Sequence, residues 1–168
     1  MTPRRLWGRL RAQTSRRRAD VGGQAHIDIE PVRPGDLEDV LALLARHQLP
    51  PEGLRDHLAT TLVARHAGHI VGSAALELYS EGALLRSVAV VPEMQGRGVG
   101  RDLTTAAIRL AQDRRAPAIY LLTTTAENYF PRLGFERISR ADVPMTVRAS
   151  VEFTSACPAS ATVMRKSL

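Results

Sequence analysis

The sequence predicts an α/β fold in which a mixed, mostly antiparallel central sheet carries helices on both faces. Three strand-like segments follow one another in the middle of the chain, and a strand–helix–strand unit comes after them. Strands joined by short turns pair antiparallel, whereas a helical crossover brings the next strand back parallel. The helix expected from about Gly98 to Arg114 is strongly amphipathic, because Leu103, Ala106, Ala107, Leu110 and Ala111 fall on one face.

The first elements are a strand, a helix and a shorter helical piece. Residues 27–33 alternate between apolar and polar side chains, which is typical of a half-buried strand. After Pro34-Gly35 the chain has apolar residues at helical spacing from Leu37, with Asp36 as the expected N-cap, and Pro50-Pro51 ends this helix. A short helical piece is expected from Gly53 to about Thr60.

The strands of the sheet come next, separated by turn residues. Turns at Ala67-Gly68 and Glu81-Gly82 divide three expected strands, at 61–66, 70–79 and 83–91. Beyond the amphipathic helix we expect a buried strand at 118–125, a short helix at 127–133 capped by Gly134, a strand at 135–139, a helical turn at 143–150 and a last strand at 162–165.

The formal charge of +6 is confined to the beginning of the chain. Residues 1–20 hold seven arginines and one acid, and the remaining residues hold acids and bases in equal number. We therefore expect a basic, disordered tail at 1–25 and one domain at 26–168, with no specific nucleic-acid partner. A disordered extension, a weak contact with nucleic acid or membrane, and a targeting peptide remain open for the tail.

Cysteine usage and hydropathy exclude several classes of protein. Cys157 is the only cysteine, so an intrachain disulfide is impossible, and the histidines show no spacing typical of metal ligands. No apolar stretch approaches the ~20 residues that span a bilayer. We expect a cytoplasmic protein without a metal or a membrane span, and a homodimer is compatible with this composition.

A glycine-rich turn between a strand and the amphipathic helix is the main functional signal. Glycines at 96, 98 and 100 leave successive backbone N–H groups unshielded, and these groups together with the helix N-terminus suit a pyrophosphate. Arg97 and Arg101 add charge that can pair with phosphate oxygens. A dinucleotide-binding unit is disfavoured because three strands precede this turn and no acid follows the next strand; a tight turn without a ligand is the other alternative.

Two motifs resemble those of the GNAT superfamily of N-acetyltransferases. Gln95-x-x-Gly98-x-Gly100 after the strand that ends at Pro92 is similar to the acetyl-CoA signature, and Tyr129 to Phe135 is similar to a second motif in which a short helix runs into Gly-Phe. The resemblance implies a sheet splayed between strands 83–91 and 118–125, with acetyl-CoA in the gap. It implies cofactor contacts from Val88, Ala89, Val90, Gln95, Gly96, Arg97, Gly98, Val99, Gly100 and Arg101.

Closer similarities point towards enzymes that acetylate small amino acids. Leu84-Leu85-Arg86-Ser87, Thr123 to Glu127 and Cys157 to Ala161 resemble the N-acetyltransferases of arsenic-resistance operons, and the chain is also similar to the acetyltransferase domain of N-acetylglutamate synthases. The implied function is acetylation of a small amino-acid-like amine, in resistance to arsenic or toxic amino-acid analogues. Glutamate or a protein amine as acceptor, or a non-catalytic acyl-CoA sensor, are the alternatives.

The catalytic groups are less well indicated than the cofactor site. A carboxylate acting through water can take the amine proton, and Glu77 and Glu81 are candidates, as is Glu127. Many GNAT enzymes place a tyrosine acid where this chain has Phe130; Tyr129 is adjacent, but one residue along a helix turns a side chain by about 100°. We therefore predict no tyrosine acid, or a displaced one at Tyr129.

The acceptor site is predicted from the strands that flank the gap. Arg86 shares strand parity with Val88 and Val90 and can bind a carboxylate as a fork, although a surface or interface arginine is an equal alternative. Thr123, Thr124 and Ser160 are the other candidate substrate contacts, and Cys157 is expected to be buried and inert.

Overall fold

The protein forms one open sheet with helices on both sides. The computed structural model describes residues 26–168, so the predicted tail at 1–25 lies outside the described residues. The sheet has seven strands in the order β1-β2-β3-β4-β5-β7-β6. Its strands are β1 (Ile27–Pro31), β2 (Thr61–His66), β3 (His69–Tyr79), β4 (Gly82–Val90), β5 (Ala118–Thr123), β6 (Glu136–Arg137) and β7 (Thr162–Ser167).

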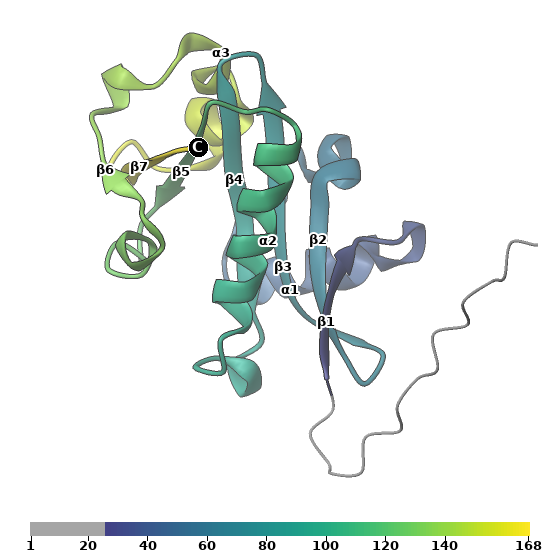
Figure 1. Cartoon of the computed structure of the whole chain (residues 1–168). Coiled ribbons are helices and arrows are strands. Elements are labelled where there is room, and N and C mark those ends of the chain that lie inside the picture. Colours follow the sequence, from purple (N-terminus) through teal and green to yellow (C-terminus); the bar gives the residue numbers. More distant parts are fainter. Residues whose placement is uncertain (1–25) are drawn as a thin grey trace, which may run out of the picture.

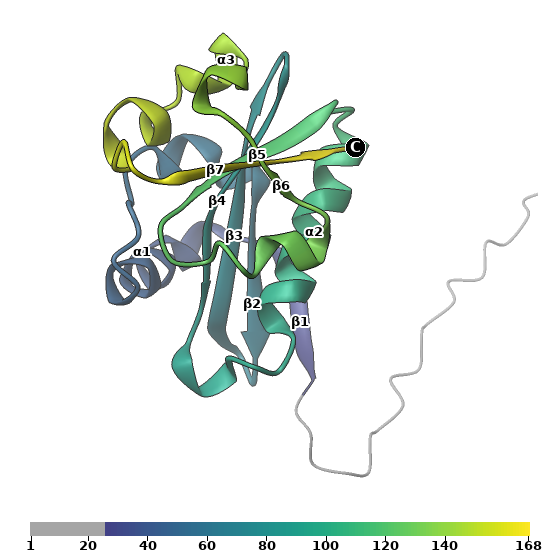
Figure 2. The same cartoon turned by 90° about the vertical axis from the view of Figure 1, so that its left-hand side faces the viewer.

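All neighbouring strands pair antiparallel except β4 and β5, which are parallel. The helix α2 (Val99–Asp113) makes the crossover between those two strands, as the strand–helix–strand pattern predicted. The predicted fold class is confirmed: the sheet is mixed and mostly antiparallel, and β5 and β7 cross β4 at a steep angle (Figure 2).

The two long helices lie on opposite faces of the sheet. In Figure 1, α2 lies in front of β3 and β4, and α1 (Leu37–Arg46) lies behind the sheet. The buried face of α2 packs Val99, Leu103, Ala107 and Ala111 into the main core cluster. The other face of the sheet is covered by Val40, Leu43 and Leu44 of α1. The sheet is therefore buried on both sides where it positions the glycine-rich turn.

Three of the elements expected after β5 are shorter than the sequence predicts, whereas β7 extends beyond the expected strand at 162–165 to Ser167. The short helix contains only Phe130–Leu133 as a 3-10 turn with Pro131 in its first turn, and Gly134 caps it at a φ of 86°. The strand expected at 135–139 is reduced to β6, because Phe135 is buried against Phe130 instead of joining the ladder. The helical turn expected at 143–150 contains only α3 (Met145–Arg148). It is followed by a π-helix, η6 (Glu152–Ala156), which the sequence did not indicate.

Asp36 has a different role from the one predicted. It precedes α1 as expected, but it makes no side-chain bond to the helix N-terminus. Its Oδ2 atom instead accepts hydrogen bonds from the Arg33 N–H at 2.8 Å and from Arg65 Nη2 at 2.7 Å. A 3-10 turn, η1 (Pro34–Asp36), runs directly into α1, so the Asp36 carboxylate is directed back towards the start of that turn.

Candidate functional site

A β-bulge in β4 is the centre of the site. Ser73 of β3 pairs with Ala89, whereas Ala75 pairs with Arg86, so β4 carries one extra residue at Ser87 and Val88. Ser87 has a φ of 56°, a left-handed conformation that is uncommon outside glycine. Its carbonyl accepts a hydrogen bond from the Ser73 hydroxyl at 2.8 Å. Such bulges re-aim side chains and interrupt pairing, and they are frequent next to active sites.

The bulge shifts the strand parity of Arg86. Ala75 and Ser73 lie two residues apart on β3, so their partners Arg86 and Ala89 share a face of the sheet. The predicted parity of Arg86 with Val88 and Val90 is therefore wrong, because a single extra residue exchanges the two faces.

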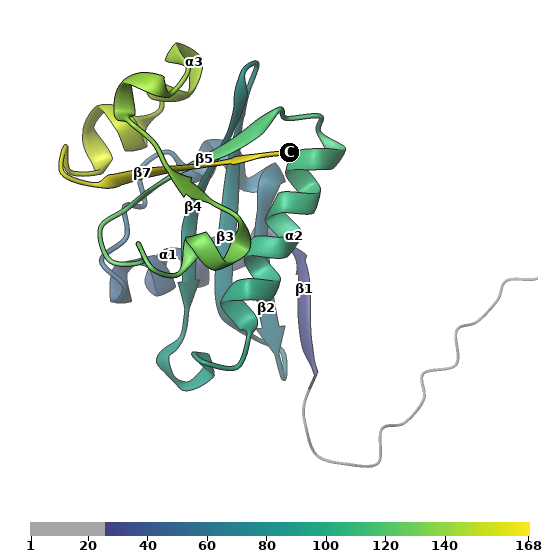
Figure 3. The ribbon, with the colours of Figure 1, turned by 60° about the vertical axis from the view of Figure 1, so that its left-hand side comes forward.

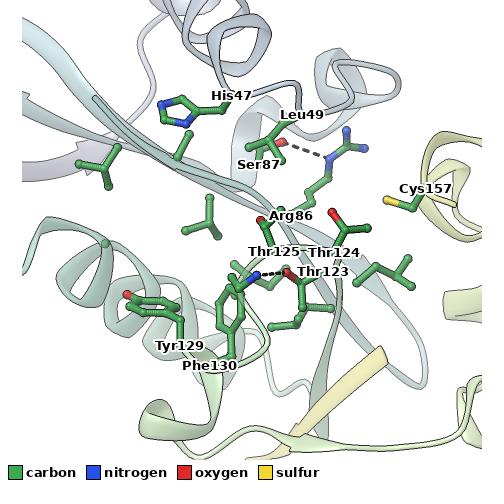
Figure 4. A pocket seen from close by; sticks show the side chains of 18 of the residues that line it. His47, Leu49, Arg86, Ser87, Thr123, Thr124, Thr125, Tyr129, Phe130 and Cys157 are labelled. Atoms are coloured by element: carbon green, nitrogen blue, oxygen red, sulfur yellow. Dashed lines mark hydrogen bonds between the residues drawn. The ribbon is translucent and has the colours of Figure 1, made fainter. Parts of the chain in front are cut away.

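The strands β4 and β5 separate after a short contact and leave a cavity between them. They pair only at Ala83–Ile119 and Leu84–Tyr120. Beyond that point, residues 85–90 and 121–126 line the two sides of a cavity of about 760 Å³. Figure 4 shows Tyr129 and Phe130 on one side of this cavity and Arg86 extending towards the side of Cys157.

The glycine-rich turn lies at one end of the cavity. Gly96 and Gly98 have φ values of 74° and 87°, which other residues adopt only with strain, and Gly98 is the N-cap of α2. Gly96, Gly98, Gly100 and Arg101 all line the cavity. This arrangement directs backbone N–H groups and a helix N-terminus at a space bordered by an arginine, which suits a pyrophosphate.

The other predicted cofactor residues differ in position. Val88, Ala89, Val90 and Gln95 line the cavity, and Gln95 Nε2 donates to the Val90 carbonyl at 3.0 Å. Val99 is buried in the main core, and Arg97 is exposed outside the cavity lining. The side chain of Val99 therefore belongs to the core, and the two arginines are not equivalent, because Arg101 lines the cavity and Arg97 does not.

Comparison with known proteins agrees with this geometry. Residues 57–137 match the model of the acetyltransferase (GNAT) domain. This part of the chain is therefore similar to a GNAT acetyltransferase domain. The match includes the bulged strand, the glycine-rich turn and the splayed pair, and it supports the expected class, an acetyl-CoA-dependent N-acetyltransferase.

Similar proteins include amino-acid acetyltransferases. The amino-acid acetyltransferase of Mycobacterium tuberculosis is 35% identical over 89 residues, which is 51% of this chain and 51% of that protein. The N-acetylglutamate synthase of Neisseria gonorrhoeae, complexed with coenzyme A and N-acetyl-glutamate, has a TM-score of 0.74 at 23% identity and covers 87% of this chain and 36% of its own. The M. tuberculosis protein Rv2747, in complex with CoA and NLQ, has a TM-score of 0.73 at 22% identity, covering 84% of this chain and 99% of its own. The chain spans less than two thirds of the length of the curated relatives it matches.

The predicted catalytic acids lie outside the cavity lining. Glu77 is 1% exposed and makes an ion pair with Arg86 at 2.7 Å, and its other oxygen accepts the Tyr79 hydroxyl. Glu81 lies at the turn between β3 and β4, where it accepts a hydrogen bond from Thr146 at 2.9 Å. Glu127 binds Arg137 and Thr162. None of these three carboxylates borders the gap between β4 and β5.

Tyr129 lies at the phosphate end of the cavity. A Cβ atom on Gly100 would lie 3.1 Å from the Tyr129 hydroxyl, and the 3-10 turn that Tyr129 precedes lies beside α2 (Figure 3). Burial raises the pKa of Tyr129 above its ordinary value, so the phenol stays protonated at neutral pH. Its contact with Gly100 places the hydroxyl at the glycine-rich turn.

Replacing Tyr129 with phenylalanine is accordingly expected to leave turnover within about threefold of the wild-type value. The hydroxyl lies against Gly100 in the glycine-rich turn, and from there we expect no proton transfer to a thiolate next to the bulge. Steady-state kinetics with the best acceptor of an amine panel test this, with the KM for acetyl-CoA as the second readout. A loss of about a hundredfold or more in kcat, with acetyl-CoA binding intact, would show that Tyr129 is a general acid after all.

The predicted substrate residues are only partly brought together. Thr123 and Thr124 line the cavity, and Thr123 Oγ1 accepts a hydrogen bond from the Ala126 N–H at 2.9 Å. Ser160 is exposed and does not border the cavity. Arg86 does border it, but its guanidinium is 1% exposed.

Arg86 is enclosed by polar partners. Its Nη1 contacts Glu77 at 2.7 Å, and its Nη2 contacts the Pro50 carbonyl at 2.9 Å and Glu152 at 3.0 Å. Its Nε donates to Ser87 Oγ at 3.3 Å. Arg86 is therefore neither a surface nor an interface arginine within the described chain; it joins β3, β4 and η6 in one buried network.

The sequence did not mark Glu152 and His47 as cavity residues, and Cys157, which was expected to be buried, is only half-buried and lines the cavity as well. Glu152 lines it at 6% exposure, and Cys157 donates to Glu152 Oε2 at 2.8 Å. His47 also lines it, and within residues 26–168 its Nε2 is buried without a hydrogen-bond partner. No local pattern marks these residues, because each comes from a segment that folds over the gap from elsewhere in the chain.

The Cys157 thiol is expected to resist alkylation in the folded protein. Burial, together with the neighbouring Glu152 carboxylate, raises the pKa of Cys157 to about 12, so almost no thiolate exists at pH 8. Iodoacetamide should react on the order of a thousandfold more slowly with the native chain than with the chain unfolded in urea. Equal rates in the two states would contradict this placement of the thiol.

Residues 26–168 contain no group of three or more His, Cys, Asp and Glu side chains placed to hold a metal ion. No helix in the same range is long and apolar enough to cross a bilayer.

Proposed function

We propose that the protein transfers the acetyl group of acetyl-CoA to the amine of a small amino-acid-like molecule. The single observation that carries this proposal is the cavity between β4 and β5, which runs from the glycine-rich start of α2 past the bulge to Arg86 and Glu152. One end is suited to phosphates and the other presents charged groups to a second substrate.

The residues of this chain fit the cosubstrate at both of its recognition points. Gly96, Gly98 and Gly100 can hold the pyrophosphate through backbone N–H groups, with Arg101 beside them. The β5-facing edge of β4 is free beyond Leu84, so its backbone can pair with the pantetheine amides. The Val90 carbonyl becomes available to such a partner once the Gln95 side chain moves away from it.

The bulge supports the chemistry of transfer. Acetyl-CoA supplies the thioester carbonyl when bound, and backbone N–H groups at Ser87 and Val88 lie outside the regular β3–β4 ladder. Preorganised N–H groups of this kind stabilise the negative charge that develops on a carbonyl oxygen under attack. Holding the two substrates on either side of the bulge lowers the reaction barrier further, because the reacting atoms are already close together.

The relatives support an amino-acid-like acceptor. Amino-acid acetyltransferases of M. tuberculosis and N. meningitidis are among them, and the N. gonorrhoeae synthase was solved with N-acetyl-glutamate. Glutamate, and arsenic- or phosphinate-containing amino acids in a resistance role, are the specific acceptors to examine first. A protein amine is the next alternative.

A free-thiol release assay over amines tests the proposal. The panel comprises the standard amino acids, their α-amides, phosphinothricin, arsenic-containing amino acids and a lysine peptide, with acetyl-CoA present throughout. Release of CoA that depends on one amino-acid-like amine supports the proposal. Stabilisation by acetyl-CoA without turnover on any amine favours an acyl-CoA-binding sensor, and turnover on the peptide alone would indicate a protein acetyltransferase.

A further inference from the structure

Glu152 is the one acidic side chain that lines the cavity within residues 26–168. It lies at the first position of the π-helix η6 and is 6% exposed. A π-turn is rare and occurs frequently at functional sites. The acceptor end of the cavity therefore presents one carboxylate, and this carboxylate comes from a segment that the sequence did not mark.

Both oxygens of Glu152 are held in place. Oε1 makes an ion pair with Arg86 Nη2 at 3.0 Å, and Oε2 accepts the Cys157 thiol at 2.8 Å. Arg86 is itself fixed by Glu77 and by the Pro50 carbonyl. A carboxylate with its position set by two partners is oriented before any substrate arrives, as catalytic groups require.

The buried cluster around Arg86 has more carboxylates than cations, and this excess of negative charge favours binding of an ammonium group. Arg86 is one cation between two buried carboxylates, Glu77 and Glu152. Two further titratable groups, Tyr79 and His57, contact Glu77, with His57 Nε2 at 3.7 Å from Glu77 Oε1. Burying an unmatched negative charge is costly, and a cation that enters from the cavity offsets this cost at Glu152.

We propose that Glu152 binds the ammonium group of the acceptor and takes its proton, with Arg86 and Cys157 as positioning residues. This inference rests on the proposed acetyl transfer. The ammonium gives one proton to the Glu152 carboxylate and becomes a neutral amine. Its nitrogen then bonds to the acetyl carbon, the carbon–sulfur bond breaks, and CoA leaves as a thiolate. The new amide nitrogen loses its second proton to water, the thiolate takes a proton from water, and Glu152 returns its proton to solvent.

In the alternative role, Arg86 binds a carboxylate of the substrate, and the contact between Arg86 and Glu152 is broken. In that case Glu152 occupies Arg86 as an internal competitor, and an acceptor carboxylate has to displace it. The two roles make opposite predictions for the variant Glu152→Gln. Loss of a base lowers kcat, whereas loss of a competitor lowers the KM for acceptors that carry a carboxylate and leaves kcat unchanged.

The experiment compares the wild-type chain with Glu152→Gln, using the best acceptor of the amine panel and its α-amide. We expect kcat to fall by on the order of a hundredfold or more, with acetyl-CoA binding unchanged by calorimetry. The turnover that remains should rise about tenfold per pH unit up to the pKa of the acceptor amine, because only amine already neutral in solution can react. The charged and titratable groups that face Glu152 itself are Arg86 and Cys157.

Two further variants keep the test decisive. Glu136→Gln removes an exposed carboxylate on β6, outside the cavity, and should leave kcat unchanged. Glu152→Asp retains the negative charge beside Arg86 but withdraws it by one methylene, and it should lose about tenfold in kcat. This variant replaces Glu152→Gln as the test if Glu152→Gln does not fold. Wild-type kcat in either Glu152 variant, or a lower KM for carboxylate acceptors, would overturn the inference. Absence of turnover in the wild-type chain on every amine would instead overturn the proposed function, and this inference with it.

Discussion

Replacing Arg86 with methionine is expected to destabilise the domain by about 3–5 kcal/mol, the cost of leaving a buried charge without its partner. Its guanidinium is 1% exposed and lies between Glu77 and Glu152, whose side chains are 2% and 7% exposed. Urea unfolding monitored by circular dichroism measures the change. The effect should be larger than for most single substitutions, because two carboxylates lose the same cation.

Two comparison variants separate charge from volume in this prediction. Arg33→Met removes an arginine that is 61% exposed and pairs with Glu30, and it should change stability by no more than about 1 kcal/mol. The combination of Arg86→Met with Glu77→Gln and Glu152→Gln should recover a large part of the loss, since the unpaired charges are gone. A single variant Arg86→Met as stable as Arg33→Met would contradict the buried network.

Replacing Gly98 with valine is expected to weaken acetyl-CoA binding by at least about tenfold. Gly98 has a φ of 87° as the N-cap of α2, and a β-branched residue there is a genuine outlier. Relieving a strain of about 1–3 kcal/mol shifts the backbone that carries the N–H groups of the turn. Isothermal titration calorimetry gives the affinity directly.

The matched control for this substitution is Gly68→Val. Gly68 has a φ of 84° in the turn between β2 and β3, and nothing lies within 4 Å of a Cβ built there. It therefore introduces the same kind of strain away from the cavity. We expect a similar loss of stability in both variants but normal acetyl-CoA affinity in Gly68→Val, and equal affinities in the two variants would argue against the glycine-rich turn as the phosphate site.

The architecture was largely predictable because its signals are local. The apolar face of α2, the turn at Ala67-Gly68 and the cap at Gly134 each depend on a few neighbouring residues, and each element forms where the sequence indicated it. The glycine-rich turn was predictable for the same reason, since positive φ values at Gly96 and Gly98 are a property of residue type.

The acceptor end was not predictable because its geometry depends on contacts between distant segments. The bulge at Ser87 arises from the register between β3 and β4, and a strand pattern read by alternation alone assigned Arg86 to the wrong face. Glu152 follows Arg86 by 66 positions in the chain and meets it only when η6 folds over the gap. Nothing in the local sequence distinguishes Glu152 from a solvated acid.

Calorimetric titration of acetyl-CoA into the whole chain and into Gly98→Val determines whether the cavity between β4 and β5 binds acetyl-CoA. We predict saturable binding of one acetyl-CoA per chain, weakened at least about tenfold in the variant. An absence of binding to the wild-type chain, or binding that is identical in Gly98→Val, would show that the glycine-rich turn and the cavity do not bind acetyl-CoA.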